Sequence, residues 1–410
     1  MFFKVVKYSN NFRARAKLSV LLCTILTCQF ALAEVVFEED FDNQPDWHSE
    51  LGGNDKGGLP NNEPDTAQYK GIHTIPKGWH AVRQDPTWSP IKGHSDRHPV
   101  IEINSKTIAE NRNRAKGGGG KSFVTWRDSH DPGWKRWNSD GILYFRLPGK
   151  GLEEVYVEFW INFSNETIAS FYREELGMSK LLRITHHDDP DNFDYSNYWD
   201  FFGNNNKPNY IWTLQGNLRY GIENKYSIHR YTGRMDLNET IPNLHRQFSG
   251  GGNVSSYSPT SSWGPSGHGI GGTSPELADN KNGGVIRKGP VMMDQLYGDE
   301  TVWVKYAHYL KLNSRGGVAD GELHHYVNDQ RVLHLKGIEW VTVEQDREMT
   351  LWNMVGFGGN DYFKAFTNAH RHEEWYAIDD IVIRSSLPER LKQGGREPRP
   401  PSGISVELKN

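Results

Sequence analysis

The strongest constraint on the fold of this chain is a ten-residue stretch in which apolar and polar side chains alternate. Within Glu154–Phe163, every second residue is apolar: Val155, Val157, Phe159, Ile161 and Phe163. Successive residues of a β-strand point to opposite sides, so this spacing predicts a strand with one buried face. The opposite face would carry Tyr156, Glu158, Trp160 and Asn162, a polar and aromatic set.

The same alternation recurs along the chain, while helical periodicity is almost absent. Further strands are predicted at 35–41, 122–127, 141–147, 180–187, 210–215, 218–223, 301–313, 322–328, 351–358 and 375–384. One helix is predicted, at Glu166–Met178. Many short strands punctuated by Gly, Asn and Asp, with no strand–helix–strand rhythm, are typical of an all-β antiparallel sandwich.

The first 33 residues have the three parts of a secretory signal peptide. Five basic and no acidic residues precede an apolar run at 18–30, and Ala31–Ala33 supplies a small-x-small cleavage site. The apolar run is shorter than the roughly 20 residues that a membrane-spanning helix needs. We therefore expect cleavage near Ala33 and a mature protein that is secreted or periplasmic, with no membrane span.

Removing that leader changes both the cysteine content and the charge. The chain's two cysteines, Cys23 and Cys28, both lie in the leader, so the mature chain would have no disulfide and no cysteine ligand or nucleophile. Of the 47 Lys and Arg residues, 42 would remain against 51 Asp and Glu, a net charge of −9. A mildly acidic chain is poorly suited to binding nucleic acid. The fold would have to be held together by a large apolar core.

Aromatic residues are abundant in a chain with a mean hydropathy of −0.72. There are 14 Trp, 18 Tyr and 18 Phe. Most would fill a β-sheet core, but aromatic rings with polar tips also suit a surface that binds sugar rings.

The domain organisation follows from the strands and the loops between them. A single sandwich domain is predicted at 34–387, with long insert loops at 44–98 and 245–300 and a flexible tail at 388–410. Loops of such length in a compact domain are usually functional or disordered. Nothing in the pattern indicates an oligomeric state.

Several strand segments carry a specific resemblance. The stretches are Phe37–Asp42, Trp303–Asn313, Asp320–Leu323, Tyr326–Gln330, Phe357–Asp361 and Trp375–Ile383. Together they resemble the concanavalin-A-like jelly-roll polysaccharide lyases, particularly the alginate and glucuronan lyase branch. The resemblance is dense only from 301 to 383. It implies two curved, stacked sheets, an open groove on the concave sheet, and an acidic polysaccharide as substrate. Lectins and hydrolases share this scaffold, so the fold alone does not fix the activity.

The resemblance also implies the residues that would line the groove. The strand face of Tyr156, Glu158, Trp160 and Asn162 would form a groove wall. In the family, a strand that opens Gly-Gly-Lys-Leu carries a catalytic lysine; the matching place here reads Met178-Ser179-Lys180-Leu181, which implies Lys180 as the equivalent although the glycines are missing.

Elimination from a uronic-acid polymer needs a donor that neutralises the carboxylate, a base and an acid. Residues of these types occur on the predicted strands between 180 and 220. The candidates are Arg183 or Arg219 for neutralisation, Lys180 or His187 as base, Tyr220 as acid, and Gln215 as a further substrate-binding residue. Strict alternation puts Lys180 and Arg183 on opposite faces, so both can point into one groove only if a β-bulge intervenes.

A metal is not required for this chemistry, and no catalytic cofactor is expected. A structural calcium ion is expected instead, because the first and last strands often meet in this fold. Their meeting would bring Asp40 near Asp379, and paired carboxylates suit Ca²⁺.

The resulting hypothesis is an exported polysaccharide lyase that cleaves an acidic polysaccharide by β-elimination. Two alternatives stay open. A glycoside hydrolase would need two carboxylates facing the cleft, and no strand shows the spacing Glu-x-Asp-x-x-Glu of the retaining hydrolases of this fold. A lectin-like binding protein would bind sugar without cleaving it.

Overall fold

The structure is a computed structural model, and it describes thirteen stretches of the chain. They are residues 33–48, 75–85, 101–103, 114–128, 137–172, 176–192, 208–217, 221–229, 256–257, 277–286, 291–343, 345–363 and 373–392. The predicted leader therefore lies outside the described residues, apart from Ala33. Among the described residues, no helix is both long and apolar enough to cross a membrane.

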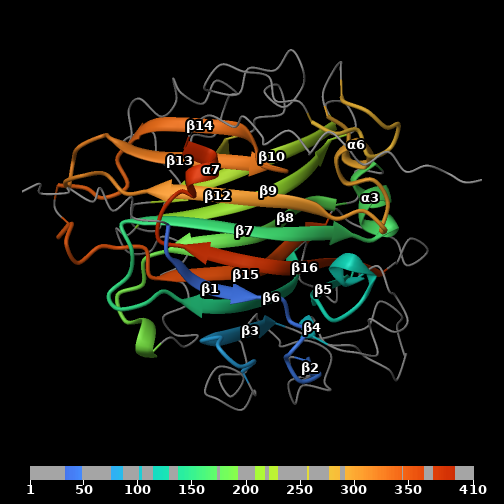
Figure 1. Cartoon of the computed structure of the whole chain (residues 1–410), viewed down its shortest axis with the longest axis horizontal. Helices are drawn as coiled ribbons and strands as arrows, with labels where there is room; N and C mark the ends of the chain where they lie inside the picture. The colour runs from blue at the N-terminus through green and yellow to red at the C-terminus, as the bar shows by residue number, and fades with distance from the viewer. Residues whose placement is uncertain are drawn as a thin grey trace, which may run out of the picture. The chain divides into compact units, whose positions relative to one another are not determined.

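The described strands form two antiparallel sheets, which confirms the predicted all-β sandwich (Figure 1). We name each sheet after a central strand. The β7 sheet has the order β14-β13-β12-β7-β16-β5-β4-β2, with β1 paired to β16. The β8 sheet has the order β11-β10-β9-β8-β15-β6-β3. The outer face of each sheet is the face turned away from the other sheet.

The strand bounds of the β7 sheet are β1 Val35–Glu39, β2 Trp47–His48, β4 Ile101–Ile103, β5 Phe123–Asp128, β7 Glu154–Phe163, β12 Val304–Lys311, β13 Gly321–Val327, β14 Gln330–Ile338 and β16 Glu373–Arg384. Those of the β8 sheet are β3 Ala81–Asp85, β6 Trp137–Arg146, β8 Leu176–Thr185, β9 Asn209–Asn217, β10 Gly221–His229, β11 Ser256–Tyr257 and β15 Met354–Phe363. The helices are α3 Asn165–Tyr172, α6 Met293–Tyr297 and α7 Glu389–Lys392, with short 3₁₀ turns at Lys116–Gly118 and Pro190–Asn192.

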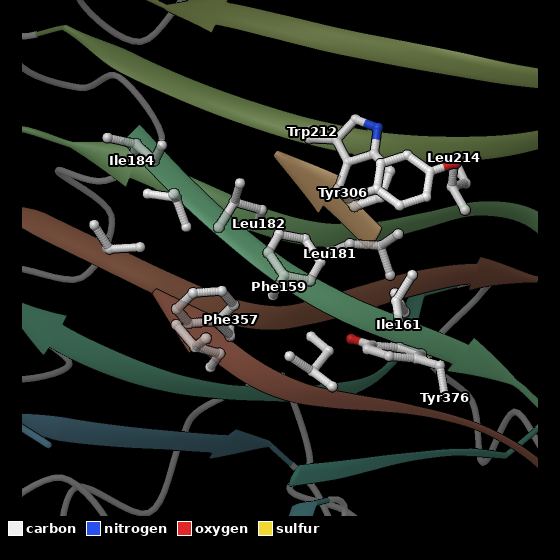
Figure 2. Packing of buried hydrophobic residues seen from close by; sticks show 14 of the residues in the cluster. Phe159, Ile161, Leu181, Leu182, Ile184, Trp212, Leu214, Tyr306, Phe357 and Tyr376 are labelled. Atoms are coloured by element: carbon white, nitrogen blue, oxygen red, sulfur yellow. The ribbon is translucent and has the colours of Figure 1, made fainter. Parts of the chain in front are cut away.

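The core lies between the two sheets, as the alternation in β7 predicts. Val155, Val157, Phe159, Ile161 and Phe163 are all essentially inaccessible to solvent. Phe159 meets Trp212 of β9 and Phe357 of β15 from the opposite sheet, with ring centroids 6.1 and 5.5 Å apart (Figure 2). Burying each large apolar side chain contributes about 1.5–3 kcal/mol, so the two sheets stabilise each other without any cross-link.

Two local predictions are wrong. The helix expected over Glu166–Met178 ends at Tyr172, and β8 begins at Leu176. Ile168 and Phe171 are buried on the inner side of the helix. Gly177 is a poor helix former, so the helix does not extend to it. From Leu176 onward the chain pairs with β15 instead. The second difference is the strand β14, which follows a tight turn at Asn328–Asp329 and which the sequence did not predict.

The expected tail and insert loops also contain ordered elements. α7 begins at Glu389, inside the expected flexible tail, and its Leu391 is buried against the outer face of the β7 sheet with Tyr156, Tyr309 and Tyr326. Figure 1 shows α7 lying over β12 and β13. Within the expected loops at 44–98 and 245–300, the described residues form β2, β3, β11 and α6.

Candidate catalytic face

A β-bulge in β8 brings two cationic side chains to the same face of the β8 sheet. Lys180 pairs with Thr213 of β9, and Leu182 already pairs with the next residue, Trp212, so Leu181 is the extra residue. Leu181 and Leu182 both belong to the core. The alternation therefore restarts after the bulge, and Lys180 and Arg183 both lie on the outer face. The sequence left this outcome open, because alternation alone separates the two residues.

A tyrosine two strands away joins these cations. Tyr144 of β6 pairs with Gly356 of β15, and Gly356 pairs with Arg183 of β8. A Cβ on Gly356 would lie 2.5 Å from Cε1 of Tyr144, so the tyrosine ring occupies the space above this glycine. Neighbouring strands lie about 4.8 Å apart, so the ring spans the first of the two strand spacings between β6 and β8. Tyr144, Gly356 and Arg183 thus form one row across the sheet.

Burial differs among the three polar side chains of this face. Arg183 and Tyr144 are both fully buried, although they point away from the core, whereas Lys180 is partly exposed. The guanidinium of Arg183 offers up to five N–H donors in a planar fork, a geometry that matches a carboxylate. The face therefore combines a fixed cation, a primary amine and a phenol.

Tyr144 was not among the predicted site residues, although the alternation of its strand places it on the outer face. Gly141–Leu147 was predicted as a strand, and its alternation places Leu143 and Phe145 on the core face, as the structure confirms. Tyr144 falls on the opposite face by the same alternation. The sequence did not show which strands lie beside this one, because strand order depends on pairing between distant segments.

His187 is placed differently from the prediction, at the end of β8 and in a hydrogen-bonded turn. Its Nδ1 accepts the backbone N–H of Asp189 at 3.2 Å, and its own backbone N–H and C=O are both bound by the side-chain amide of Asn353, at 2.8 and 2.7 Å. In the neutral ring, an accepting Nδ1 leaves the proton on Nε2. This nitrogen takes part in the turn, and the role of His187 as a base stays a prediction.

Three other predicted site residues receive little or no structural description. Arg219 and Tyr220 lie outside the described residues. Gln215 lies in β9, where its backbone pairs with that of Glu223 in β10.

The predicted groove wall on β7 lies on the other side of the molecule from Lys180. Because β7 and β8 belong to different sheets, their outward side chains point away from each other, and the expected single groove is wrong. Tyr156 is fully buried and donates to Glu158 at 2.6 Å, and Glu158 also forms an ion pair with Arg390 of α7. Asn162 is fully buried and donates to the carbonyl of Val302 at 2.6 Å. Tyr156 and Asn162 therefore offer no surface to a sugar.

Trp160 and Glu158 do line an open hollow of about 640 Å³ on this outer face. The ring of Trp160 lies 4.7 Å from Nζ of Lys116 and 5.9 Å from Nζ of Lys305. The rest of the lining includes four acidic residues, Glu38, Glu39, Asp40 and Asp380, and one basic residue, Lys305. An acidic rim of this kind repels a polyanion.

The two carboxylates of the expected calcium pair differ in burial. Asp379 of β16 is 4% exposed, and its two oxygens accept the backbone N–H groups of Lys116 and Asp380 at 2.9 and 2.7 Å. Burial raises the pKa of Asp379 to about 8, and the negative charges of Asp380 and Asp42 add to the increase. Asp40 is exposed and accepts the backbone N–H of Asp42 at 3.2 Å. The charge of Asp42 thus reaches Asp379, and the pairing of Asp40 with Asp379 at a calcium ion stays a prediction.

Comparison with known proteins gives a fold likeness and no family. No protein-family profile matches the sequence, and no curated protein matches it. Among solved structures, the chain is similar to an alginate lyase (10% identity, TM-score 0.40, covering 85% of this chain and 96% of that one). It is also similar to an endo-β-1,4-glucuronan lyase from Trichoderma reesei (9%, 0.36, 76% and 92%). A third is a Z. galactanivorans protein solved with laminaritriose and laminaritetraose (9%, 0.37, 86% and 100%).

Proposed function

We propose that this protein is an exported carbohydrate-active enzyme that cleaves an acidic polysaccharide by β-elimination on the outer face of the β8 sheet. The β-bulge at Leu181 is the observation that carries the proposal, because it aligns Lys180 with Arg183 on that face. A face with two cations suits a polymer that bears a carboxylate on each sugar. The acidic hollow on the opposite sheet does not.

The roles follow from the chemistry of each side chain. Arg183 binds the uronate carboxylate and neutralises the charge that develops there when the proton at the neighbouring carbon is removed. Such preorganised donors are usually the largest single contribution to catalysis. Lys180, partly open to solvent, takes that proton as the base, for which its amine must be in the neutral form. Tyr144 donates a proton to the leaving oxygen, in the role first assigned to Tyr220. Arg183 and Tyr144 are fully buried. The proposal therefore requires that the residues packed over these two side chains move when the substrate binds.

The activity is tested by incubating the protein with alginate, glucuronan and a neutral glucan. Elimination creates an unsaturated uronate, which absorbs ultraviolet light, whereas hydrolysis releases reducing ends without that absorbance. We expect absorbance to rise on at least one uronic-acid polymer. Reducing ends on the neutral glucan without any unsaturated product would establish a hydrolase, and binding without cleavage would establish a lectin-like protein.

The assignment of residues is tested with conservative variants. Lys180→Gln and Tyr144→Phe should each lower the rate of elimination about 10²- to 10⁴-fold, the range for loss of a general base or acid. Lys150→Gln is the matched control, because Lys150 lies in the exposed turn at 148–151. Full activity in both Lys180→Gln and Tyr144→Phe would remove the site from this face.

We further propose that one calcium ion binds between Asp42 and Asp379. Both carboxylates already receive backbone N–H groups, Asp42 from Lys121 at 2.7 Å. Burial is the main cause of the raised pKa of Asp379, and a divalent cation would offset the negative charges of Asp380 and Asp42 that add to it. Its role would be structural, since the site lies where the segment after β1 meets β16 of the β7 sheet.

A further inference from the structure

Two histidines and a glutamate meet on the outer face of the β13–β14 hairpin, apart from both sites above. Oε2 of Glu322 lies 2.9 Å from Nε2 of His324 and 3.2 Å from Nε2 of His334. All three ligand-type atoms lie within 4.8 Å of one another, and this is the one such group among the described residues. The side chains are mostly shielded, with exposed fractions of 25% for Glu322, 6% for His324 and 16% for His334.

The hairpin register holds these residues together. His324 of β13 stands directly opposite His334 of β14, and Glu322 lies two residues earlier on the same face of β13. The register is fixed at one end by the turn, where Asn328 and Asp329 have φ angles of 47° and 64°. Positive φ at both central residues is the mark of a tight type I′ hairpin turn. The pairing of β13 with β14 thus brings the three side chains together, and hydrogen bonds from Glu322 to both histidines link them.

The distances fit a tetrahedral metal ion with little movement. Zn²⁺ binds imidazole nitrogen at about 2.0–2.1 Å and carboxylate oxygen at about 2.0–2.2 Å, so ligand atoms of a tetrahedral site lie roughly 3.4 Å apart. The two nitrogen–oxygen distances are already close to that value.

Tyr326 supplies an outer partner to one ligand. Nδ1 of His324 lies 3.0 Å from the hydroxyl oxygen of Tyr326, which is 2% exposed. When Nε2 of His324 binds a metal, Nδ1 carries the proton and donates it to that hydroxyl. Metal-binding histidines almost always have such a partner on their second nitrogen, which fixes the ring orientation.

Nearby positive charges should weaken the binding of a metal ion to these three residues. Arg331 and Lys336 of β14 both act electrostatically on His334, and Arg331 also acts on His324. With one carboxylate and two neutral imidazoles, the site carries a single negative charge of its own. It should bind more weakly than closed sites with four protein ligands, and a water molecule would take the fourth position.

We propose that Glu322, His324 and His334 form a binding site for one first-row divalent cation of the Zn²⁺ class. Two imidazoles favour Zn²⁺, Ni²⁺ or Cu²⁺ over Ca²⁺ or Mg²⁺, which prefer oxygen ligands. Bound there, the ion links β13 to the edge strand β14 and stabilises the edge of the β7 sheet. Anything that binds the folded state and not the unfolded state raises stability in this way.

The test measures Zn²⁺ binding to the full, untagged chain by equilibrium dialysis and metal analysis. The wild type should bind one Zn²⁺ at this site, and a large excess of Ca²⁺ should not displace it. His334→Gln and Glu322→Gln should each weaken that binding by about 100-fold or more, because loss of a residue that merely orients a ligand already costs about 10- to 100-fold. His80→Gln is the matched control, a half-buried histidine whose Nε2 bonds the carbonyl of Pro190.

A second measurement separates loss of the site from loss of the fold. Zn²⁺ should raise the midpoint of thermal unfolding of the wild type and of His80→Gln, and should leave that of His334→Gln unchanged. Circular dichroism should show the same strand content in all three. Absence of Zn²⁺ binding to the wild type, or equal affinity in His334→Gln, Glu322→Gln and the wild type, would overturn the proposal.

Discussion

The two outer faces of the sandwich differ in charge and in what covers them. On the β8 sheet, a bulge collects Lys180 and Arg183 beside Tyr144. On the β7 sheet, the lining of the hollow beside Trp160 includes five carboxylates and one lysine, and α7 covers Tyr156. The chain as a whole is close to neutral, with a formal net charge of −4. Local arrangement of charge, rather than net charge, therefore distinguishes the face suited to an acidic polymer.

The largest expected effect contrasts the two faces directly. Arg183→Lys keeps the charge but loses the planar fork, and it should lower the rate of elimination about 10²- to 10³-fold, as loss of a preorganised donor does elsewhere. Trp160→Ala on the opposite face should leave the rate within about twofold. The measurement is the initial rate of unsaturated product formation. The contrast between faces fails if Trp160→Ala is the more damaging change.

The acidic face should give a pH-dependent stability that the cationic face lacks. Asp379 has a pKa of about 8 in the folded protein, raised mainly by burial, against an ordinary value of 3.8. The folded state therefore holds this proton over a range where the unfolded state has lost it, so the contribution of Asp379 is complete below about pH 4 and is lost as the pH rises to about 8.

Asp379→Asn removes that titration. Without added Ca²⁺, the variant should gain free energy of unfolding relative to the wild type between pH 4 and 8, by an amount on the order of a few kcal/mol. Added Ca²⁺ should stabilise the wild type near pH 8 and not the variant. Denaturant unfolding at several pH values measures both effects. A constant difference between the two proteins across this range would show that Asp379 does not titrate as described.

The layer between the faces has its own pH dependence, of opposite sign. His308 and His325 are fully buried with ring centroids 4.4 Å apart, and Nδ1 of His308 lies 2.8 Å from the hydroxyl of Tyr210. Burial lowers the pKa of His308 to about 3, and burial together with the charge of His308 lowers the pKa of His325. Both rings stay neutral in the folded state, so stability is full above about pH 6.5 and falls as the pH drops toward 3.

His325→Phe replaces one titrating ring by an aromatic one beside Trp212 and Tyr306. The variant should lose stability less steeply below pH 6.5, by up to about 1.4 kcal/mol per pH unit, the value for one proton. The histidines of the β13–β14 hairpin add to the slope of both proteins and cancel in the difference. The prediction is contradicted if the two slopes coincide.

The smallest expected effect concerns helix α7, which packs on the outer face of the β7 sheet. Leu391 of α7 is 5% exposed and packs in a cluster with Tyr156, Tyr309 and Tyr326. Leu391→Ala should lower the free energy of unfolding by about 2 kcal/mol, at the low end for such truncations because the site lies at the surface. Elimination activity should be unchanged. A loss of activity as large as that of Arg183→Lys would mean that the two faces act together.

Some site features followed from the sequence and others could not. Alternation correctly assigned Phe159 to the core and Trp160 to the outer face. It could not show that Lys180 and Arg183 share a face, because a bulge is set by pairing with β9 and β15, far along the chain. It also could not show that α7 covers Tyr156, since Leu391 lies more than two hundred residues away.

The sequence by itself determined which side chains of each strand lie together, because the period of two is a property of the extended backbone. It also determined that the chain must rely on a large aromatic and aliphatic core, since the segment after the expected leader contains no cysteine. Only the tertiary structure decided which strands became neighbours. Strand order and register depend on contacts between segments distant in sequence, and a shift of one residue moves a side chain to the other face. For this reason the residues expected to line one groove lie on the outer faces of two different sheets. For the same reason Tyr144 lies in one row with Arg183.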